Sequence, residues 1–515
     1  MGFAMTQGHQ PSLSVNKNLL ANFFGQGWRA LMSLLFVPFY LRILGVEAYG
    51  LIGLYTSLQL ALALLDAGLR PALAREMARF TGGAMDAQAI RTLLRSIELP
   101  LLALSAVITL IMFAAAPWLA AHWVQPQSLD QSTVAAAFRL MGLVAAAQFL
   151  EAAYDSSLSG LQRQVLQNAV VIFISTLRGF GALAVLWVVP HLTAFFLWQG
   201  AVALLSCLML AAAVYRSLPA ADGPVRFSLT ALRQIRGYAF GMFGIAVLAL
   251  LLTQSDKFVL AHYIPLAEVT HYTLAASLVG AIAMLSGPIG NAFFPRMTQL
   301  RQIGDHAALA ETFHRLSGIM AMIVGSASAV LVMFGERIVN AWIHNPELSA
   351  QSAPIISLLA LAVLFNTITS LPYFLQLANG VTGIALRINL AILIVLMPSL
   401  VVMIVSYGGV GAALCAVGVN LAGMTLSAAF TFPRYLPGAA RRWWLVDLLR
   451  PLAIVFAVAF GLSRLLPTAS SAVLEVLLLG LCGVLTLSFG ALSNPQIRNS
   501  VLAPVRRLVF SPSAK

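Results

Sequence analysis

Long apolar runs follow one another along this sequence and constrain its fold more than any other feature. A helix needs roughly 20 mostly apolar residues to cross the hydrocarbon core of a bilayer, and fourteen segments meet that requirement. They are residues 19–42, 48–68, 93–118, 133–155, 168–189, 193–215, 238–262, 271–293, 314–334, 352–377, 384–406, 410–432, 451–466 and 472–492. The chain of 515 residues is 60% hydrophobic and only 9% charged, unlike a water-soluble domain. The sequence therefore predicts an all-α polytopic membrane protein with about 14 transmembrane helices.

The connections between these segments differ in charge, and the difference predicts their orientation. Alternate connections hold most of the 30 basic residues, whereas the others contain only Arg42, Arg337 and Arg464. Connections rich in arginine and lysine stay in the cytoplasm. We therefore expect both ends of the chain to be cytoplasmic, which agrees with an even number of spans. Because the basic residues follow the topology, the net charge of +13 does not indicate a nucleic-acid groove.

The two halves of the chain repeat the same spacing of spans and breaks. A shift of 221 positions places Glu47 on Glu268, and a shift of 219 places Trp123 on Trp342. Six spans followed by six, both sets starting inside, predict a parallel pseudo-two-fold repeat about an axis along the membrane normal. The expected domains are a cytoplasmic tail (1–18), an N-lobe (19–216), a cytoplasmic amphipathic linker (217–237), a C-lobe (238–432), a cytoplasmic loop (433–450), two C-terminal helices (451–492) and a second tail (493–515).

Four basic residues lie more than one helical turn inside the ends of the predicted spans, where a charge costs several kcal/mol unless it faces a bundle interior or a water-filled cavity. They are Arg29, Arg139, Arg178 and Lys257. Each arginine is interpreted either as lining a substrate path or as belonging to an interhelical ion pair or a helix cap. The mid-span positions of Arg29 and Arg178 favour the substrate path. Arg139 lies about two turns into its span, so its side chain could instead extend outward to the interface.

Polar residues recur with Arg29 on one face of the first span. Asn22 and Gln26 precede it at helical spacing and form a polar stripe on an otherwise apolar helix. Such a stripe is expected to line a cavity. Asn22, Gln26, Arg29, Arg139, Arg178 and Lys257 are therefore the predicted substrate-cavity residues.

Asp256 and Lys257 are adjacent in span seven and admit three interpretations. The pair neutralises itself or neighbouring helices, or Asp256 carries a coupling proton or cation, or Lys257 meets an anionic substrate. Adjacent helical residues diverge by about 100°, so both side chains cannot point at one partner. We favour Asp256 as a structural counter-ion or gating residue and Lys257 as cavity-facing.

Three further acidic residues, Asp66, Glu151 and Asp155, are placed near the cytoplasmic ends of their spans. There we expect interfacial solvation or pairing with Arg70 and Arg163. Asp66 is grouped with Asp256 as a structural counter-ion or gating residue.

Walker A, metal-ligand and catalytic motifs are absent from the sequence. No lysine follows a glycine, which excludes a Walker A loop, and the three cysteines have no metal-ligand spacing. The histidines lack the His-x-x-x-His pattern of a zinc helix. External connections are too short for a catalytic domain and hold no acid/base cluster. We therefore expect neither an enzyme nor a bound cofactor or metal.

Four sequence stretches resemble one family of membrane proteins. They are Leu41–Gly50 (LRILGVEAYG), Leu65–Leu69 (LDAGL), Ser255–Leu260 (SDKFVL) and Phe294–Met297 (FPRM). They are similar to stretches of the polysaccharide transporters, the flippase branch of the multidrug/oligosaccharidyl-lipid/polysaccharide exporter superfamily, over spans one to twelve. The chain departs from the pattern at residues 265–267 (PLA), where relatives often have a glycine.

The resemblance implies two six-helix lobes around a central cavity that opens alternately to each side of the bacterial inner membrane. The implied substrate is an oligosaccharide on undecaprenyl diphosphate, such as an O-antigen or exopolysaccharide repeat unit. Arg29, Arg178 and Lys257 would neutralise its headgroup. Polysaccharide polymerase and chain-length proteins are implied partners, together with membrane lipid and without nucleic acid.

Two alternatives stay open at this point. A cation-coupled multidrug exporter of the same superfamily would need unpaired carboxylates in its cavity, whereas the mid-span charges here are mainly positive. A membrane polysaccharide polymerase or ligase would need catalytic residues in a sizeable external loop.

Overall fold

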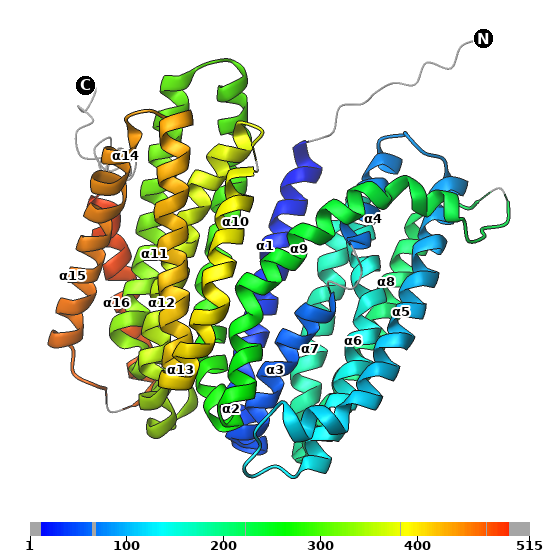
Figure 1. Ribbon diagram of the computed structural model, residues 1–515, viewed down its shortest axis with the longest axis horizontal. Helices are drawn as coiled ribbons and strands as arrows, with labels where there is room; N and C mark the ends of the chain where they lie inside the picture. Colours follow the sequence, from blue (N-terminus) through cyan, green and yellow to red (C-terminus); the bar gives the residue numbers. More distant parts are fainter. Residues whose placement is uncertain (1–11, 64–67, 222, 382, 470, 494–515) are drawn as a thin grey trace, which may run out of the picture. The chain divides into compact units, whose positions relative to one another are not determined.

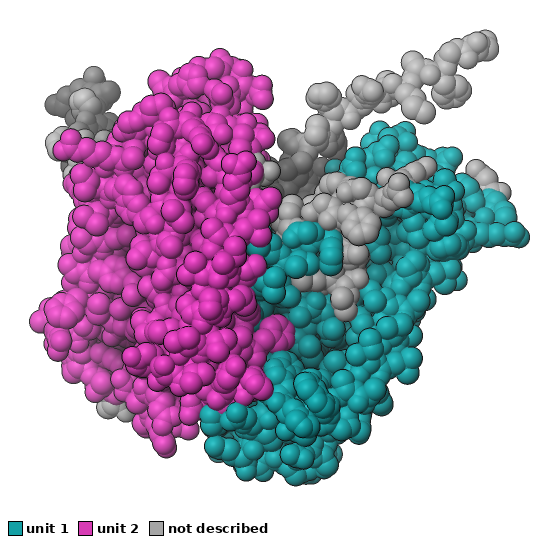
Figure 2. Space-filling view, viewed as in Figure 1, with its two compact units in different colours: residues 1–254, 265–267 teal, residues 255–264, 268–515 magenta. Residues whose placement is uncertain are grey.

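The computed structural model describes residues 12–63, 68–221, 223–381, 383–469 and 471–493, and these are organised as helices and short connections (Figure 1). This confirms the prediction of an all-α polytopic membrane protein. Eleven described helices are long and apolar enough to cross a membrane. Their packing divides the chain into two compact units, residues 1–254 with 265–267 (unit 1) and residues 255–264 with 268–515 (unit 2) (Figure 2).

Unit 1 is built from the first eight helices and most of the ninth. They are α1 (Ser12–Leu35), α2 (Val37–Leu44), α3 (Val46–Ala63), α4 (Leu69–Thr81), α5 (Ala87–His122), α6 (Gln131–Gly160), α7 (Gln164–Val188), α8 (Leu192–Ser217) and α9 (Leu229–Tyr263). Helix α6 is the central one, because 56% of its spanning segment is buried and it packs against both α5 and α8 (Figure 1).

Helices α1 and α7 pack closely, and small residues permit this approach. Phe36 lies between α1 and α2, and its ring packs directly on Gly179 of α7. A Cβ atom added to Gly179 would lie 2.1 Å from Cε2 of Phe36. Phe36 is buried with Met32 and Leu183 in one apolar cluster. Pro38 stands in the first turn of α2, where its missing N–H leaves no helical bond unmade. This packing fixes the segment of α7 that carries Arg178.

Helix α4 occupies the basic connection between the second and third predicted spans. It begins after Gly68, whose φ of 76° is a conformation that favours glycine because glycine has no Cβ atom. Helix α4 packs against α6. The Thr81 hydroxyl is 3.2 Å from the Gly160 carbonyl oxygen, to which it donates at the end of α6. Arg70, Arg75 and Arg79 of this connection therefore lie on an ordered helix.

The connection between α8 and α9 is held on α5. The Arg91 guanidinium donates to the carbonyl oxygens of Pro219, at 2.6 Å, and Leu218, at 3.0 Å. The amide of Ser228 donates to the Ser96 hydroxyl at 2.8 Å. Helix α9 then runs without a break from Leu229 to Tyr263, so the segment predicted as an amphipathic linker is shared between this connection and the first turns of α9.

Unit 2 contains the remaining helices. They are α10 (Leu266–Gln302), α11 (His306–Ile343), α12 (Pro346–Ala378), α13 (Gly383–Tyr435), α14 (Ala439–Arg442), the π-helical turn η2 (Trp443–Leu449), α15 (Arg450–Leu465) and α16 (Ala472–Ser493). Helix α11 is central, with 67% of its spanning segment buried, and it packs against α12, α15 and α16 (Figure 1).

The 53 residues of α13 are two helices joined at a glycine. Gly408 has φ 56° and ψ −136°, a conformation that is almost confined to glycine. A Cβ on Gly411 would lie 1.9 Å from the Met403 carbonyl oxygen, so the two halves meet at very short range. The break lies between the predicted spans 384–406 and 410–432.

Candidate functional site

A polar cluster joins three helices inside unit 1. It consists of Arg178 on α7, Glu151 on α6 and Ser206 on α8, and is called the Arg178 cluster below. Arg178 Nη2 lies 3.9 Å from Glu151 Oε2, and the Ser206 hydroxyl donates to Glu151 Oε1 at 2.8 Å. The glutamate is therefore held by α8 on one side and faces the guanidinium of α7 on the other.

The arginine in this cluster is incompletely satisfied. At 3.9 Å the contact with Glu151 is an ion pair but too long for a hydrogen bond. Among the described residues, Arg178 Nε and Nη2 and Glu151 Oε2 are buried and have no hydrogen-bond partner. A buried charged group without its hydrogen bonds costs free energy. An added anion could supply the missing acceptors.

Amide and phenol side chains extend the cluster towards α3. Gln59 donates to the Tyr55 hydroxyl at 2.6 Å and also to the Gln148 side-chain oxygen on α6. Tyr55 in turn lies within electrostatic range of Arg178 and Glu151. The Arg178 cluster therefore combines a cationic guanidinium with neighbouring amide and phenol groups, which can form hydrogen bonds with neutral hydroxyls.

Helix α1 contributes two of its predicted polar residues through exposed side chains. Gln26 and Arg29 are exposed, and Arg29 interacts electrostatically with Glu151. Asn22 instead accepts a hydrogen bond from Asn168 of α7 at 2.7 Å. The stripe on α1 thus combines a residue that binds α7 with residues that are open to a ligand.

Arg139 is half-buried near the start of α6 and lies outside the Arg178 cluster. Twelve residues separate it from Glu151 on the same helix, which is about 18 Å at 1.5 Å per residue. The structure therefore does not bring Arg139 to Arg178. Asp66 lies outside the described residues.

Asp256 and Lys257 belong to unit 2 and are both half-buried. The Tyr272 hydroxyl of α10 donates to Asp256 Oδ2, and the backbone N–H of Lys257 donates to Asp256 Oδ1 at 2.8 Å. Tyr272 is almost completely buried, so this bond ties α9 to α10 in the interior of the unit.

The prediction for Glu151 was wrong. We expected interfacial solvation or pairing with Arg163, but the carboxylate faces Arg178 and Ser206. Asp155, one turn further along α6, accepts from Gln167 at 2.9 Å. A signal was present in the sequence, because span four holds Glu151 and span five holds Arg178. Pairing the two residues required knowledge of how each helix is rotated about its axis.

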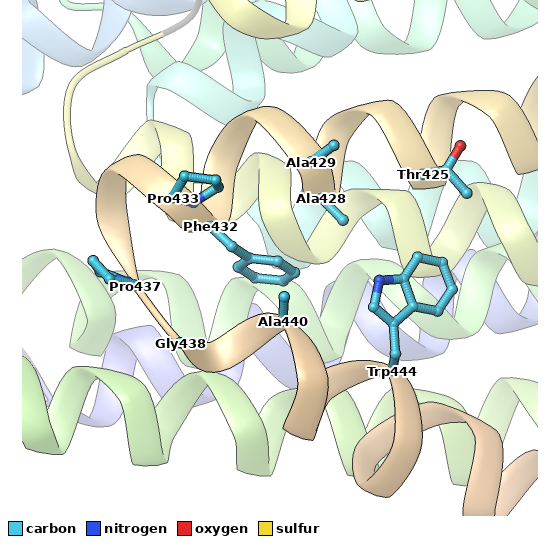
Figure 3. A pocket seen from close by; sticks show the side chains of 9 residues that line it. All are labelled: Thr425, Ala428, Ala429, Phe432, Pro433, Pro437, Gly438, Ala440 and Trp444. Atoms are coloured by element: carbon cyan, nitrogen blue, oxygen red, sulfur yellow. The ribbon is translucent and has the colours of Figure 1, made fainter.

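A hollow lies in unit 2, at the end of α13. Its volume is about 550 Å³, and Figure 3 shows apolar side chains such as Phe432, Pro433 and Trp444 around it. The lining contains one polar side chain, Thr425. Within the described ranges no group of three His, Cys, Asp or Glu residues could hold a metal ion. The Arg178 cluster is therefore the candidate site.

Comparison with known proteins decides the family. The profile of the family described as polysaccharide biosynthesis protein matches residues 15–301, more than half of the chain. The chain belongs to this family. The resemblance found in the sequence is thereby confirmed, and the matched segment includes Arg29, Glu151, Arg178 and Lys257.

This polysaccharide biosynthesis family member is similar to several transporters. A candidate O-antigen transporter of Shigella flexneri is 20% identical over 403 residues, which are 78% of this chain and 94% of the relative. The solved structure of the lipid II flippase MurJ in an inward closed conformation has a TM-score of 0.65 at 13% identity, covering 95% of this chain and 99% of MurJ. An inward-facing MATE-family multidrug transporter has a TM-score of 0.60 at 14% identity, covering 81% and 95%. The chain therefore has the fold shared by MurJ and the MATE transporters.

Proposed function

We propose that the protein flips an oligosaccharide linked to undecaprenyl diphosphate across the bacterial inner membrane by alternating access. The substrate would be an O-antigen or exopolysaccharide repeat unit. The observation that carries the proposal is the Arg178 guanidinium, whose buried Nε and Nη2 atoms lack acceptors among the described residues, in a polysaccharide biosynthesis family member. A guanidinium can hold a diphosphate through two parallel N–H···O bonds.

The proposed topology has fourteen spans with both termini in the cytoplasm. The two halves of α13 count as two spans, and α3 and α9 join the eleven apolar helices. Residues 19–216 and 238–432 would be the two repeats, and 451–492 the appended pair. The distribution of arginine among the connections supports this orientation.

The proposed headgroup site contains Arg178 and Arg29 of unit 1, with Gln26 on α1 near Arg29 in the chain. Lys257 of unit 2 is proposed separately as a residue that meets the anionic substrate. Arginine fixes a diphosphate by its planar fork, whereas lysine acts as a mobile point charge. Amide groups such as Gln59 and Gln148 are suited to sugar hydroxyls. Asn22 and Arg139 are the weaker members, since Asn22 binds Asn168 and Arg139 lies along α6 from the cluster.

A cation-coupled multidrug exporter is the second candidate, and the structural similarity to a MATE transporter favours it. Glu151 is a carboxylate with an unsatisfied oxygen, as a cation site would require. It faces Arg178 and Arg29, however, and these positive charges disfavour a bound cation.

Export of surface polysaccharide tests the flippase proposal. Strains lacking the native gene would carry wild-type protein, Arg29→Ala or Arg178→Ala, with Ser175→Ala as the control. Ser175 is on α7 near Arg178, but its hydroxyl bonds carbonyl oxygens of its own helix. We expect both arginine variants to lose surface glycan and to accumulate the lipid-linked precursor at unchanged protein abundance. Normal surface glycan in both would contradict the proposal, and efflux of cationic dyes without glycan export would favour the second candidate.

A further inference from the structure

The ion pair between Arg178 and Glu151 differs from the ion pair between Arg337 and Glu475, which also joins two long helices. Arg337 Nε and Nη2 lie 2.6 and 3.1 Å from the two Glu475 oxygens, and the remaining guanidinium donors reach backbone carbonyl oxygens. Arg178 approaches Glu151 through one nitrogen at 3.9 Å. Its Nε and Nη2 have no hydrogen-bond partner among the described residues. One pair is a closed structural clamp, and the other is open.

Glu151 also accepts a hydrogen bond that does not involve arginine. The Ser206 hydroxyl donates to Oε1 at 2.8 Å from α8, whereas Arg178 approaches Oε2 from α7. Glu151 can therefore give up the arginine and keep one hydrogen bond. A glutamate without this bond would be left buried and unsatisfied, at a cost that would oppose release.

The formal charges of the arginines and carboxylates at Glu151 cancel when no substrate is present. Arg178 and Arg29 supply two positive charges from α7 and α1, and Glu151 and Asp155 supply two negative charges from α6. Tyr55 faces the group from α3 as a neutral phenol. A diphosphate that approached Arg178 would meet Glu151 as a competing anion, because two anions share one guanidinium poorly in a low-dielectric site.

We propose that Glu151 is an internal counter-anion that occupies Arg178 between transport cycles and is displaced by the diphosphate group of the substrate. The proposal rests on the flippase function proposed above and adds a device for release. Glu151 weakens the hold on the diphosphate and returns to Arg178 when the headgroup leaves. The residue would thus set the affinity for substrate at a value that permits turnover.

Binding of undecaprenyl diphosphate to the purified full-length protein in nanodiscs tests this proposal. Glu151→Gln removes the charge and keeps an oxygen that can accept from Ser206. We expect it to bind undecaprenyl diphosphate about tenfold more tightly than wild type, a typical size for one close charge pair, and to transport more slowly. Asp155→Asn is the matched control, since it removes a negative charge one turn away whose partner is Gln167. It should change the Kd by less than about threefold.

A second variant predicts the opposite sign. Ser206→Ala keeps every charge but removes the hydrogen bond that Glu151 would retain after leaving Arg178. It should weaken binding of undecaprenyl diphosphate, and it decides the matter if Glu151→Gln does not fold. Ser175→Ala should leave the affinity unchanged.

The outcomes separate this proposal from the flippase function. If wild type binds undecaprenyl diphosphate, Arg178→Gln loses binding and Glu151→Gln binds no tighter than wild type, the counter-anion role is overturned and the headgroup site stands. If neither wild type nor Glu151→Gln binds the lipid, both proposals fail. Inorganic diphosphate is the parallel probe, and tighter binding of that probe alone would assign the site to a free anion and overturn the proposal for a lipid headgroup.

Discussion

Arg337 of α11 and Glu475 of α16 form a two-point ion pair, with Nε to Oε1 at 2.6 Å and Nη2 to Oε2 at 3.1 Å. Glu475 also accepts from the amide of Ala469 at 2.8 Å. The pair lies mostly out of solvent, beside the apolar contacts of Phe334 with Leu479. It fastens the last two helices to the central helix of unit 2.

Replacement of Arg337 by Ala should lower the stability of unit 2. The change leaves the Glu475 carboxylate buried without its cation, and breaking such a pair costs about 3 kcal/mol. We expect a clear fall in Tm of the detergent-purified protein. Arg464→Ala is the control, because Arg464 is exposed and rests on the Phe460 ring at 5.1 Å, a contact that contributes at most about 1 kcal/mol. Equal Tm values for the two variants would contradict a clamping role for Arg337.

Two glycines of α1 should respond oppositely to alanine. A Cβ on Gly25 would lie 1.9 Å from Asn168 Oδ1, so Gly25→Ala should force α1 away from α7 and lower both Tm and transport. A Cβ on Gly27 would meet nothing within 4 Å, and Gly27→Ala should raise stability by about 0.5–1 kcal/mol through helix propensity. Thermal melting and glycan export measure both effects. A tolerated Gly25→Ala would show that the two helices can separate without cost.

Asp130, which caps the start of α6, should make stability depend on pH below 4. Hydrogen bonds from Ser132 and Thr133 lower the pKa of its carboxyl from 3.8 to about 2. Because the pKa is lower in the folded state, this stabilisation is fully present above pH 3.8 and is lost as pH falls through about 2. Asp130→Asn keeps a capping oxygen without the charge. The difference in Tm between wild type and Asp130→Asn should shrink between pH 4 and pH 2, and a constant difference would exclude this linkage.

The sequence was informative about helices and less so about which of their faces meet. Residues 168–189 were expected as a span and α7 covers Gln164–Val188, because apolar length alone dictates such a helix. The position of Arg178 on that helix was therefore predictable. Its approach to Glu151 was not, since pairing depends on how α6 and α7 are rotated, and contacts such as Phe36 with Gly179 fix that rotation.

Helix α4 was not predicted from the sequence. Its residues are too polar to indicate a membrane span, and its arginines were used only to predict the topology. The structure buries Leu73 and Met77 on one face of α4 and leaves Arg79 half-exposed beside Glu76 at 2.8 Å. This is the pattern of an amphipathic surface helix, which periodicity could have detected.

The bond between Tyr272 and Asp256 distinguishes a structural role for Asp256 from a role that needs its charge. The Tyr272 hydroxyl and the Lys257 amide both donate to the carboxylate, so a neutral side chain with an oxygen in the same place could still accept. If Asp256 is structural, Asp256→Asn should retain most of the transport activity, whereas Asp256→Ala leaves the buried hydroxyl unsatisfied, at a cost of about 1–3 kcal/mol. Tyr272→Phe should lower the Tm, as Asp256→Ala does, and should keep normal transport activity at low temperature. Glycan export and thermal melting of the three variants provide the measurement.

Loss of export in Asp256→Asn at unchanged Tm would instead assign the negative charge itself to the transport cycle, as expected of a residue that carries a coupling proton or cation.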